Sequence, residues 1–295
     1  MQHALAISEV VEGFEGGGCP IGVNSPGHSS YACPVRVSPF VQINDMALTK
    51  KAGEIWREIS EILVSDAPNL DASEHVGLLT VIVGIRQVAV FLDVADLEAK
   101  KLVRLLGQVD LIAFVGRVPE LVCTWESPHR AEITSIFRGK LQSSAFWVCR
   151  NKHDANAISK GIDQVAAGQL LGYPGCCIDA LQQDNADFED ALVRGWTREF
   201  GDDPERIGQA WRENRKVHVE FEPKAAHRVP RTFALFPFVQ HIACESCLGP
   251  GDTPTAGLNF AYRDLVAESD PALFDYLITV ARRSRTSQGR QRSLP

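Results

Sequence analysis

LLGYPGCCIDALQQ, residues 170–183, places two adjacent cysteines, Cys176 and Cys177, just after a proline. Proline favours the first helical position, because its fixed φ suits a helix and its missing N–H group has no partner there. We therefore expect a helix that begins at Pro174 and carries both thiols in its first turn. The unpaired N–H groups and the positive dipole end of that turn favour thiolate over thiol.

A second pair of cysteines, Cys244 and Cys247, lies with His241 in HIACESC, residues 241–247. Two intervening residues let a turn aim both sulfurs at one metal ion. The same spacing occurs in thiol-redox sites, where it follows a strand and opens a helix. A Gly-Pro-Gly sequence at 249–251 would end such a helix at once. The spacing therefore favours metal binding over redox activity.

The two pairs together predict a single site. Its expected ligands are the thiolates of Cys176, Cys177, Cys244 and Cys247, with His241 as an alternative ligand or a neighbour. Soft thiolates select zinc or an iron–sulfur cluster over magnesium or calcium. Adjacent cysteines reach different irons of a cluster more easily than they chelate one zinc ion with relaxed geometry, which slightly favours iron–sulfur. A zinc ion with three protein ligands and an open position would instead be catalytic.

Two other interpretations of the cysteines stay open. The site could be a thiol-redox or nucleophilic centre, or the cysteines could be structural, since free cysteine is among the most buried residue types. In a catalytic site, we expect Cys177, His241 and Tyr173 to act on the substrate. Tyr173 lies beside the cysteines and could donate a proton or simply pack.

The cysteine motifs also carry a resemblance. The run from Gly172 to Cys177 reads Gly-Tyr-Pro-Gly-Cys-Cys, and His241-Ile-Ala-Cys244 follows further along the chain. This arrangement resembles the Gly-Tyr-Pro-x-Cys-Cys … His-x-x-Cys pattern of a little-characterised prokaryotic family, over about residues 165–270. The resemblance implies that both segments belong to one site and does not imply a particular reaction.

A basic segment, HRVPR, supplies His227, Arg228 and Arg231. Arginine can hold a carboxylate or phosphate with two parallel hydrogen bonds. These three residues are therefore candidates for binding an anionic cofactor or substrate, with a solvated basic loop as the simpler alternative.

The pattern of apolar residues predicts an α/β fold, with a small mixed sheet domain followed by a largely helical region that carries the Cys-rich site. We expect a helix over 46–64, a strand–helix–strand unit with its helix at 96–107, and later helices at 154–172, 174–183, 186–200, 204–214 and beyond Pro254, with a break near Asp270-Pro271. Short apolar runs rich in Val, Ile and Phe predict strands at 77–84, 87–94, 110–116, 120–125 and 143–149. The expected division is an irregular segment (1–45), an α/β domain (46–150), a helical Cys-site domain (151–285) and a basic disordered tail (286–295).

Composition excludes several classes of protein. The 295 residues are 45% apolar and carry a net charge of −7, which argues against a nucleic-acid or anionic-membrane binder. No apolar run is long enough to predict a membrane span. The N-terminus lacks the basic start and apolar run of a secretory signal, so we expect a cytoplasmic protein. Reduced cysteines then point to metal binding or catalysis rather than disulfides.

These observations predict an enzyme of small-molecule metabolism with a thiolate-ligated metal or iron–sulfur site and a small-molecule, anionic substrate. Redox, sulfur-transfer and metal-assisted chemistry all fit the site, and the oligomeric state stays open. The alternative is a non-enzymatic protein in which zinc joins residues 170–183 to residues 240–250 while the α/β part binds a partner.

Overall fold

The computed structural model describes residues 50–65, 72–92, 96–117, 132, 144–213, 215–221 and 224–292. The expected irregular segment 1–45 and the expected strand at 120–125 lie outside these ranges, as do Cys19, Cys33 and Cys123.

A three-stranded sheet forms in the first half of the chain. It contains β1 (Val88–Leu92), β2 (Ile112–Arg117) and β3 (Ser144–Cys149), in the order β1-β3-β2. Both outer strands pair with β3 antiparallel, so that every pairing in this sheet is antiparallel, although a mixed sheet was expected. The two outer strands run parallel to each other, and the predicted strand–helix–strand unit is confirmed by β1, α4 and β2.

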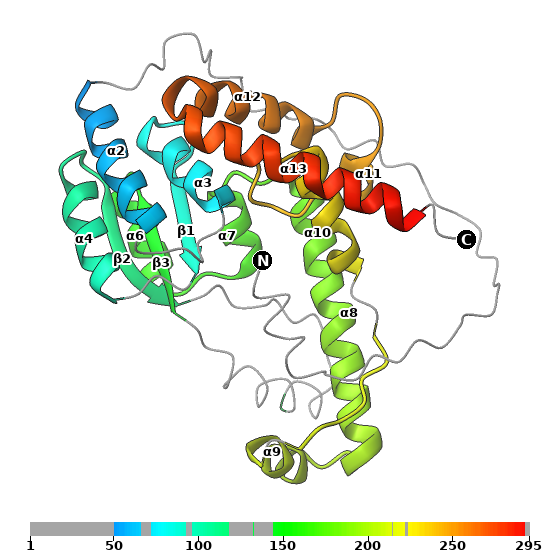
Figure 1. Ribbon diagram of the computed structural model, residues 1–295. Helices are drawn as coiled ribbons and strands as arrows, with labels where there is room; N and C mark the ends of the chain where they lie inside the picture. Colours follow the sequence, from blue (N-terminus) through cyan, green and yellow to red (C-terminus); the bar gives the residue numbers. More distant parts are fainter. Residues whose placement is uncertain are drawn as a thin grey trace.

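Most of the rest of the described chain is helical, which gives a mostly helical protein with a small sheet (Figure 1). The helices are α2 (Lys50–Ser65), α3 (Ala72–Ile82), α4 (Asp96–Gly107), α6 (Lys152–Ser159), α7 (Gln164–Leu170), α8 (Gly175–Phe200), α9 (Pro204–Arg212), α10 (Lys224–Leu235), α11 (Glu245–Leu248), α12 (Pro254–Ser269) and α13 (Pro271–Arg292). None of the helices in the described ranges is both long enough and apolar enough to span a membrane.

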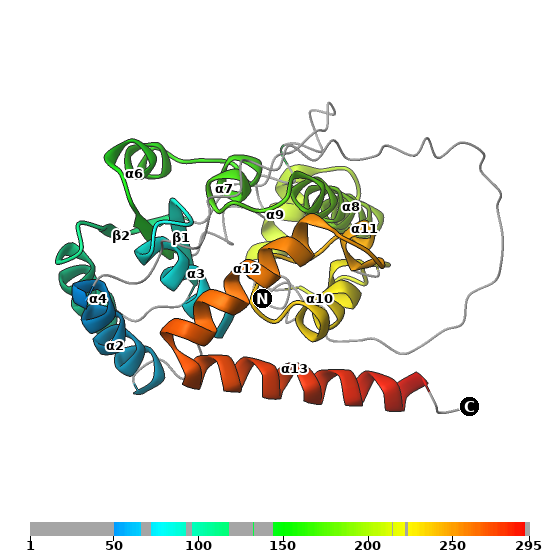
Figure 2. The ribbon, with the colours of Figure 1, turned by 90° about the horizontal axis from the view of Figure 1, so that it is seen from above.

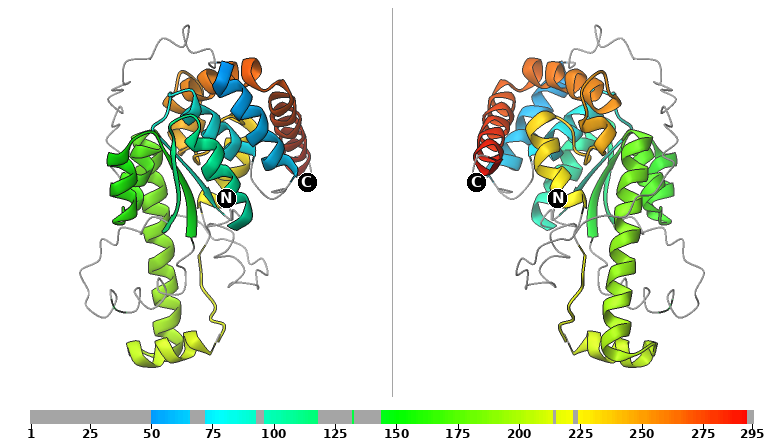
Figure 3. Two further views of the ribbon diagram at one scale, coloured as in Figure 1. Left: turned by 90° about the vertical axis from the view of Figure 1, so that its left-hand side faces the viewer. Right: turned by 90° about the vertical axis from the view of Figure 1, so that its right-hand side faces the viewer.

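Helices cover both faces of the sheet, as the edge-on views in Figure 3 show. Successive residues of a strand point to opposite faces. Phe91 and Phe146 pack into the core formed with α2, α3 and α4. Val88 and Trp147 point to the other face, where α6 and α7 cover them. This two-sided burial explains why the strands read as continuous apolar runs in the sequence.

The apolar run at 77–84 was expected to be a strand, and this expectation was wrong, because residues 72–82 form α3. The helix is buried on every side, since Val76, Leu78, Leu79 and Val81 are each at most 1% exposed. A helix that is apolar all round has no amphipathic period, so its sequence resembles a buried strand.

The Cys-bearing helix is also longer than expected. Instead of two helices at 174–183 and 186–200, α8 runs unbroken for 26 residues. Figure 1 shows it projecting from the rest of the fold, with α9 at its far end. There Trp196 packs edge-on against Trp211 of α9, with ring centroids 5.4 Å apart. This separate apolar cluster stabilises the last turns of α8.

The C-terminal helices follow the predicted break. Asp270 ends α12, and its carboxylate accepts hydrogen bonds from the Leu273 amide and the Trp56 indole. Helices α12 and α13 contact each other where they meet at this break, and they diverge from it (Figure 2). The backbone of α13 is helical to Arg292, where the sequence suggested a tail from residue 286. The segment HRVPR, for which a solvated basic loop was one expectation, lies in α10, whose helix contains Pro230.

A close helix contact fixes the start of α8. A Cβ atom added to Gly168 in α7 would lie 2.9 Å from Cγ1 of Ile178, one residue after the adjacent cysteines. Glycine at 168 therefore allows the two helices to approach closely.

We predict that Gly168→Ala lowers the free energy of unfolding by about 1–3 kcal/mol, because the new methyl group overpacks the contact with Ile178. Urea denaturation measures this change. Gly107→Ala is the matched control, since a Cβ atom at Gly107 meets nothing within 4 Å. Equal stabilities for the two variants would contradict this account of Gly168.

Candidate metal centre

The four cysteines that were predicted as metal ligands lie together. Cys176 and Cys177 occupy the first turn of α8, Cys244 caps the N-terminus of α11, and Cys247 lies within α11. All four Sγ atoms lie within 4.8 Å of one another, although about 67 residues separate the two pairs along the chain. This cluster could bind a metal.

Several donors surround the sulfurs. The Cys244 amide donates to Sγ of Cys177 at 3.4 Å, and the hydroxyl of Thr255 lies 3.6 Å from the same sulfur. The Ser246 hydroxyl lies 3.0 Å from Sγ of Cys244. N–H and O–H groups near sulfur stabilise a thiolate, and such partners orient the ligands of metal sites.

The thiols influence one another's ionisation. Hydrogen bonding with Cys177 and then Cys247 holds the pKa of Cys244 far below its usual range. Hydrogen bonding with Cys244 and then with Cys247 raises the pKa of Cys177. Burial, followed by the nearby charge of Cys244, raises the pKa of Cys176. One thiolate is therefore favoured while its neighbours keep their protons. A bound cation would displace those protons, so metal affinity increases with pH.

The dimensions of the cluster fit a tetrahedral ion. With zinc–sulfur bonds of about 2.3 Å, tetrahedral geometry separates the sulfurs by about 3.8 Å. Sγ of Cys176 and Sγ of Cys247 are already 3.6 Å apart. The remaining sulfur pairs need to move by at most about 1 Å to reach that spacing.

Ties between α8, α10 and α11 hold the two cysteine pairs together. Arg228 in α10 forms a buried ion pair with Asp184 in α8. The Thr232 hydroxyl in α10 accepts a hydrogen bond from the amide of Ala243, just before the second pair. Thr253 caps α12 and donates to the carbonyl of Cys247. The loop that carries the second pair is thus anchored at both ends.

His241 lies beside the cluster, outside the group of four candidate ligands. Its Nε2 atom is 2.9 Å from Oγ1 of Thr255, the hydroxyl that also contacts Cys177. Burial, reinforced by the charge of Arg86, lowers the pKa of His241 to about 3, so this histidine is neutral at physiological pH. The Tyr173 ring lies against it, with centroids 5.2 Å apart. The three residues predicted to be catalytic, Cys177, His241 and Tyr173, therefore lie close together.

The basic segment has carboxylate partners within the chain. Arg228 pairs with Asp184, and both oxygens of Glu245 accept hydrogen bonds from Arg231 at 2.9 Å. His227 is exposed on the same helix. These contacts give both guanidinium groups a role in joining helices, and the suggestion that the segment binds an anion stays a prediction.

Cys149 lies apart from the four clustered cysteines, on β3 and facing α6 and α7. Burial, followed by the charge of Asp154, raises its pKa to about 12, so its thiol is protonated and inert.

Three residues of the site were not foreseen from the sequence. Thr255 and Thr232 bond to groups beside the cysteines, and Arg86 lies over Tyr173 with its guanidinium carbon 5.4 Å from the ring centroid. A threonine next to a helix start, such as Thr255, normally indicates capping, and neither Thr232 within α10 nor an arginine after an apolar run gives a sign of its contacts. Their positions depend on contacts between distant segments.

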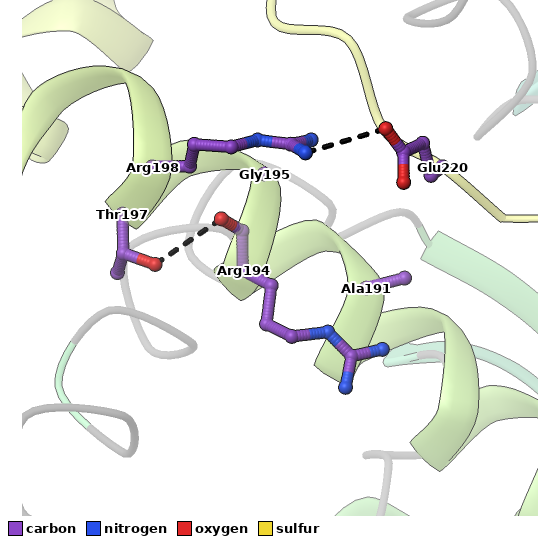
Figure 4. Close-up of a pocket in the computed structure, with 6 residues that line it drawn as sticks. All are labelled: Ala191, Arg194, Gly195, Thr197, Arg198 and Glu220. Carbon is purple, nitrogen blue, oxygen red and sulfur yellow. Dashed lines mark hydrogen bonds and ion pairs between the residues drawn. The ribbon is translucent and has the colours of Figure 1, made fainter.

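A surface pocket of about 620 Å³ lies further along α8 (Figure 4). Arg194 lines it, and Arg198 reaches across to pair with Glu220 at 3.3 Å. At 1.5 Å per residue, about 25 Å of helix separates this pocket from the cysteines. The pocket therefore does not contribute to the metal centre.

Comparisons of this chain with protein-family models, curated proteins and solved structures gave no match.

We predict that Thr255→Val lowers the free energy of unfolding by about 1–3 kcal/mol, because valine keeps the shape but leaves the buried Nε2 of His241 without its hydroxyl partner. Thr255→Ser keeps the hydroxyl and is the control, with a smaller expected loss. Urea denaturation distinguishes them. A valine variant as stable as the wild type would show that the hydroxyl is dispensable.

Proposed function

We propose that this protein binds one zinc ion through the thiolates of Cys176, Cys177, Cys244 and Cys247. The observation that carries the proposal is the gathering of all four sulfurs within 4.8 Å of one another. Without a metal the cluster favours one thiolate, at Cys244, and a divalent cation would stabilise all four sulfurs as thiolates by neutralising their charge. Sulfur ligands are those that zinc prefers in structural sites.

The spacing supports a single ion more than an iron–sulfur cluster. In a four-iron cluster each cysteine binds a different iron, which spreads the sulfurs further apart than ligands that share one ion. The adjacency of Cys176 and Cys177 favoured a cluster from the sequence alone. In the structure, however, these two sulfurs also lie within 4.8 Å of each other, which is compatible with a shared ion.

A zinc ion with four thiolate ligands would join the first turn of α8 to α11. Such a closed set of ligands is typical of structural zinc, and its binding energy contributes directly to folding. The ion would fix the relative positions of these elements, which also meet through a small apolar cluster that includes Ala243 and Leu248.

A metal-dependent enzyme acting on a small molecule is the second candidate. It is favoured by the polar residues Tyr173, His241 and Thr255, which lie next to the cysteines, and by the half-buried position of Cys176. When bound, the metal would supply electrophilic activation. His241, neutral and held by Thr255, could form a hydrogen bond with a substrate nearby.

We predict that protein purified without chelators and under anaerobic conditions contains about one zinc ion per chain, is colourless and lacks acid-labile sulfide. Elemental analysis and visible absorption measure these properties. Iron with a matching amount of sulfide would contradict the zinc proposal and show that the site holds an iron–sulfur cluster. Less than about a tenth of an equivalent of any metal would refute the metal proposal altogether.

We also predict that Cys176→Ser, Cys177→Ser, Cys244→Ser and Cys247→Ser each lower zinc retention during dialysis against a chelator, by at least about tenfold, because each removes one thiolate. Cys149→Ala is the matched control, since this thiol is buried in the sheet and should not affect zinc. If one cluster cysteine can be replaced without loss of zinc, that cysteine is not a ligand.

A further inference from the structure

Arg86 is a buried cation next to the cysteine cluster, with only 4% of its surface exposed. It follows the turn after α3, where its backbone amide and that of Ile85 both donate to the Thr80 carbonyl. This turn needs Gly84, whose φ of +86° is in the left-handed region. Arg150 donates to the carbonyl of Val81 at 2.7 Å and so holds the end of α3. The backbone at Arg86 is therefore firmly positioned.

Nη1 of the Arg86 guanidinium donates to Oε1 of Gln240 at 2.5 Å. Nε and Nη2 are buried and have no hydrogen-bond partner of normal geometry among the described residues, although the charge of Arg86 and a side-chain hydrogen bond with it both act to lower the pKa of Tyr173. These two nitrogens share one edge of the guanidinium, and their N–H bonds point in parallel. That edge is the one that binds both oxygens of a carboxylate.

Among the described residues, Gln240 and Tyr173, which contact Arg86, are uncharged. Burial raises the pKa of Tyr173, whose ring the guanidinium covers, and also raises that of Tyr262 nearby. His241 is neutral, and Gln240 is an uncharged amide. The nearest acidic group identified by its effect on Tyr173 is Glu74, whose charge raises the pKa of that phenol only slightly compared with burial. Among the ion pairs of the described residues, Arg86 takes part in none.

A buried cation with two unsatisfied donors is unfavourable, because each unpaired donor loses its bonds to water without replacement. Arginine cannot escape this cost by losing its proton. An anionic partner with two acceptor oxygens would remove both penalties at once. The ion pair of Arg228 with Asp184 shows that elsewhere in this fold a carboxylate neutralises the charge of a buried arginine, although Nε of Arg228 has no hydrogen-bond partner among the described residues.

We propose that the Nε–Nη2 edge of Arg86 binds the carboxylate of a small molecule. One arginine edge among uncharged neighbours matches a planar group with a single negative charge better than a phosphate, which normally requires several donors or cations. The Tyr173 ring contacts both the Arg86 guanidinium and the His241 ring. The Thr255 hydroxyl contacts both His241 and the sulfur of Cys177. A molecule held at Arg86 would lie beside the metal centre, and its assignment as the substrate class of that centre rests on the proposed function.

Sodium acetate is the test ligand for metal-loaded, full-length protein, with sodium chloride at equal ionic strength as the reference. We expect acetate to raise the thermal midpoint in a saturable way, since a ligand that binds the folded state alone stabilises it. Arg86→Gln should weaken acetate binding by at least about tenfold, and Arg86→Lys should weaken it similarly because lysine keeps the charge but lacks the fork. Inorganic phosphate is titrated in parallel.

Arg263→Gln is the matched control, because it removes a partly exposed arginine of α12 that pairs with its neighbour Asp264 and should leave acetate binding unchanged. The proposal fails if acetate has no more effect than chloride on the wild type, or if Arg86→Lys binds acetate as tightly as the wild type. It also fails if Arg263→Gln abolishes binding, or if phosphate binds through Arg86 and acetate does not. The wild-type titration and Arg86→Lys decide the outcome should Arg86→Gln not fold.

Zinc is quantified in each sample so that the two proposals are tested separately. Acetate binding through Arg86 in protein that holds no metal would leave the anion site standing and refute the zinc site. Stoichiometric zinc without acetate binding would leave the zinc site standing and refute the anion site.

Discussion

The contact between the first turn of α8 and the loop before α11 is the constraint on which the site depends. There the Cys244 amide donates to the sulfur of Cys177, and four sulfurs gather within 4.8 Å. The buried ion pair between Asp184 and Arg228 ties α8 to α10, the helix that leads into this loop. Burial of the Asp184 carboxylate raises its pKa more than Arg228 lowers it, so the pair is costly to desolvate. Its contribution is therefore to orientation: each partner requires the other to be near.

Charge explains how the neighbouring groups are arranged. Four clustered thiols are small apolar groups when protonated, but become a concentrated negative charge as they ionise. A divalent cation would neutralise the negative charge of the thiolates, and a carboxylate would separately neutralise the positive charge of Arg86. Neutral His241 and the hydroxyl of Thr255 lie between them and carry no net charge. This separation keeps the guanidinium from neutralising the thiolates, and leaves its free edge for another anion.

Part of this architecture could be predicted from the sequence because it is encoded locally. The helix α4 has a clear amphipathic period, β1, β2 and β3 are short apolar runs, and Asp270-Pro271 ends a helix. The grouping of the cysteines followed from their spacing and chemistry. The identity of α3 could not be predicted, because a completely buried helix lacks the polar face that defines helical periodicity. Nor could the unbroken course of α8, whose polar middle, QQDNADFED, gives no helical signal without the contacts of α9 and α10.

The exposure of the four cysteines constrains how such a centre could act on a substrate. Cys177, Cys244 and Cys247 are each at most 5% exposed, whereas Cys176 is half-buried at the start of α8. A tetrahedral ion with four thiolates has no free position, so a substrate could reach it only by displacing a ligand or expanding its coordination. Of the four candidate ligands, Cys176 is the most exposed, and its departure would leave the other three buried contacts in place. A purely structural ion requires no such departure. The exposure of this one thiol is therefore the feature that distinguishes a purely structural metal site from one that can free a coordination position for a substrate.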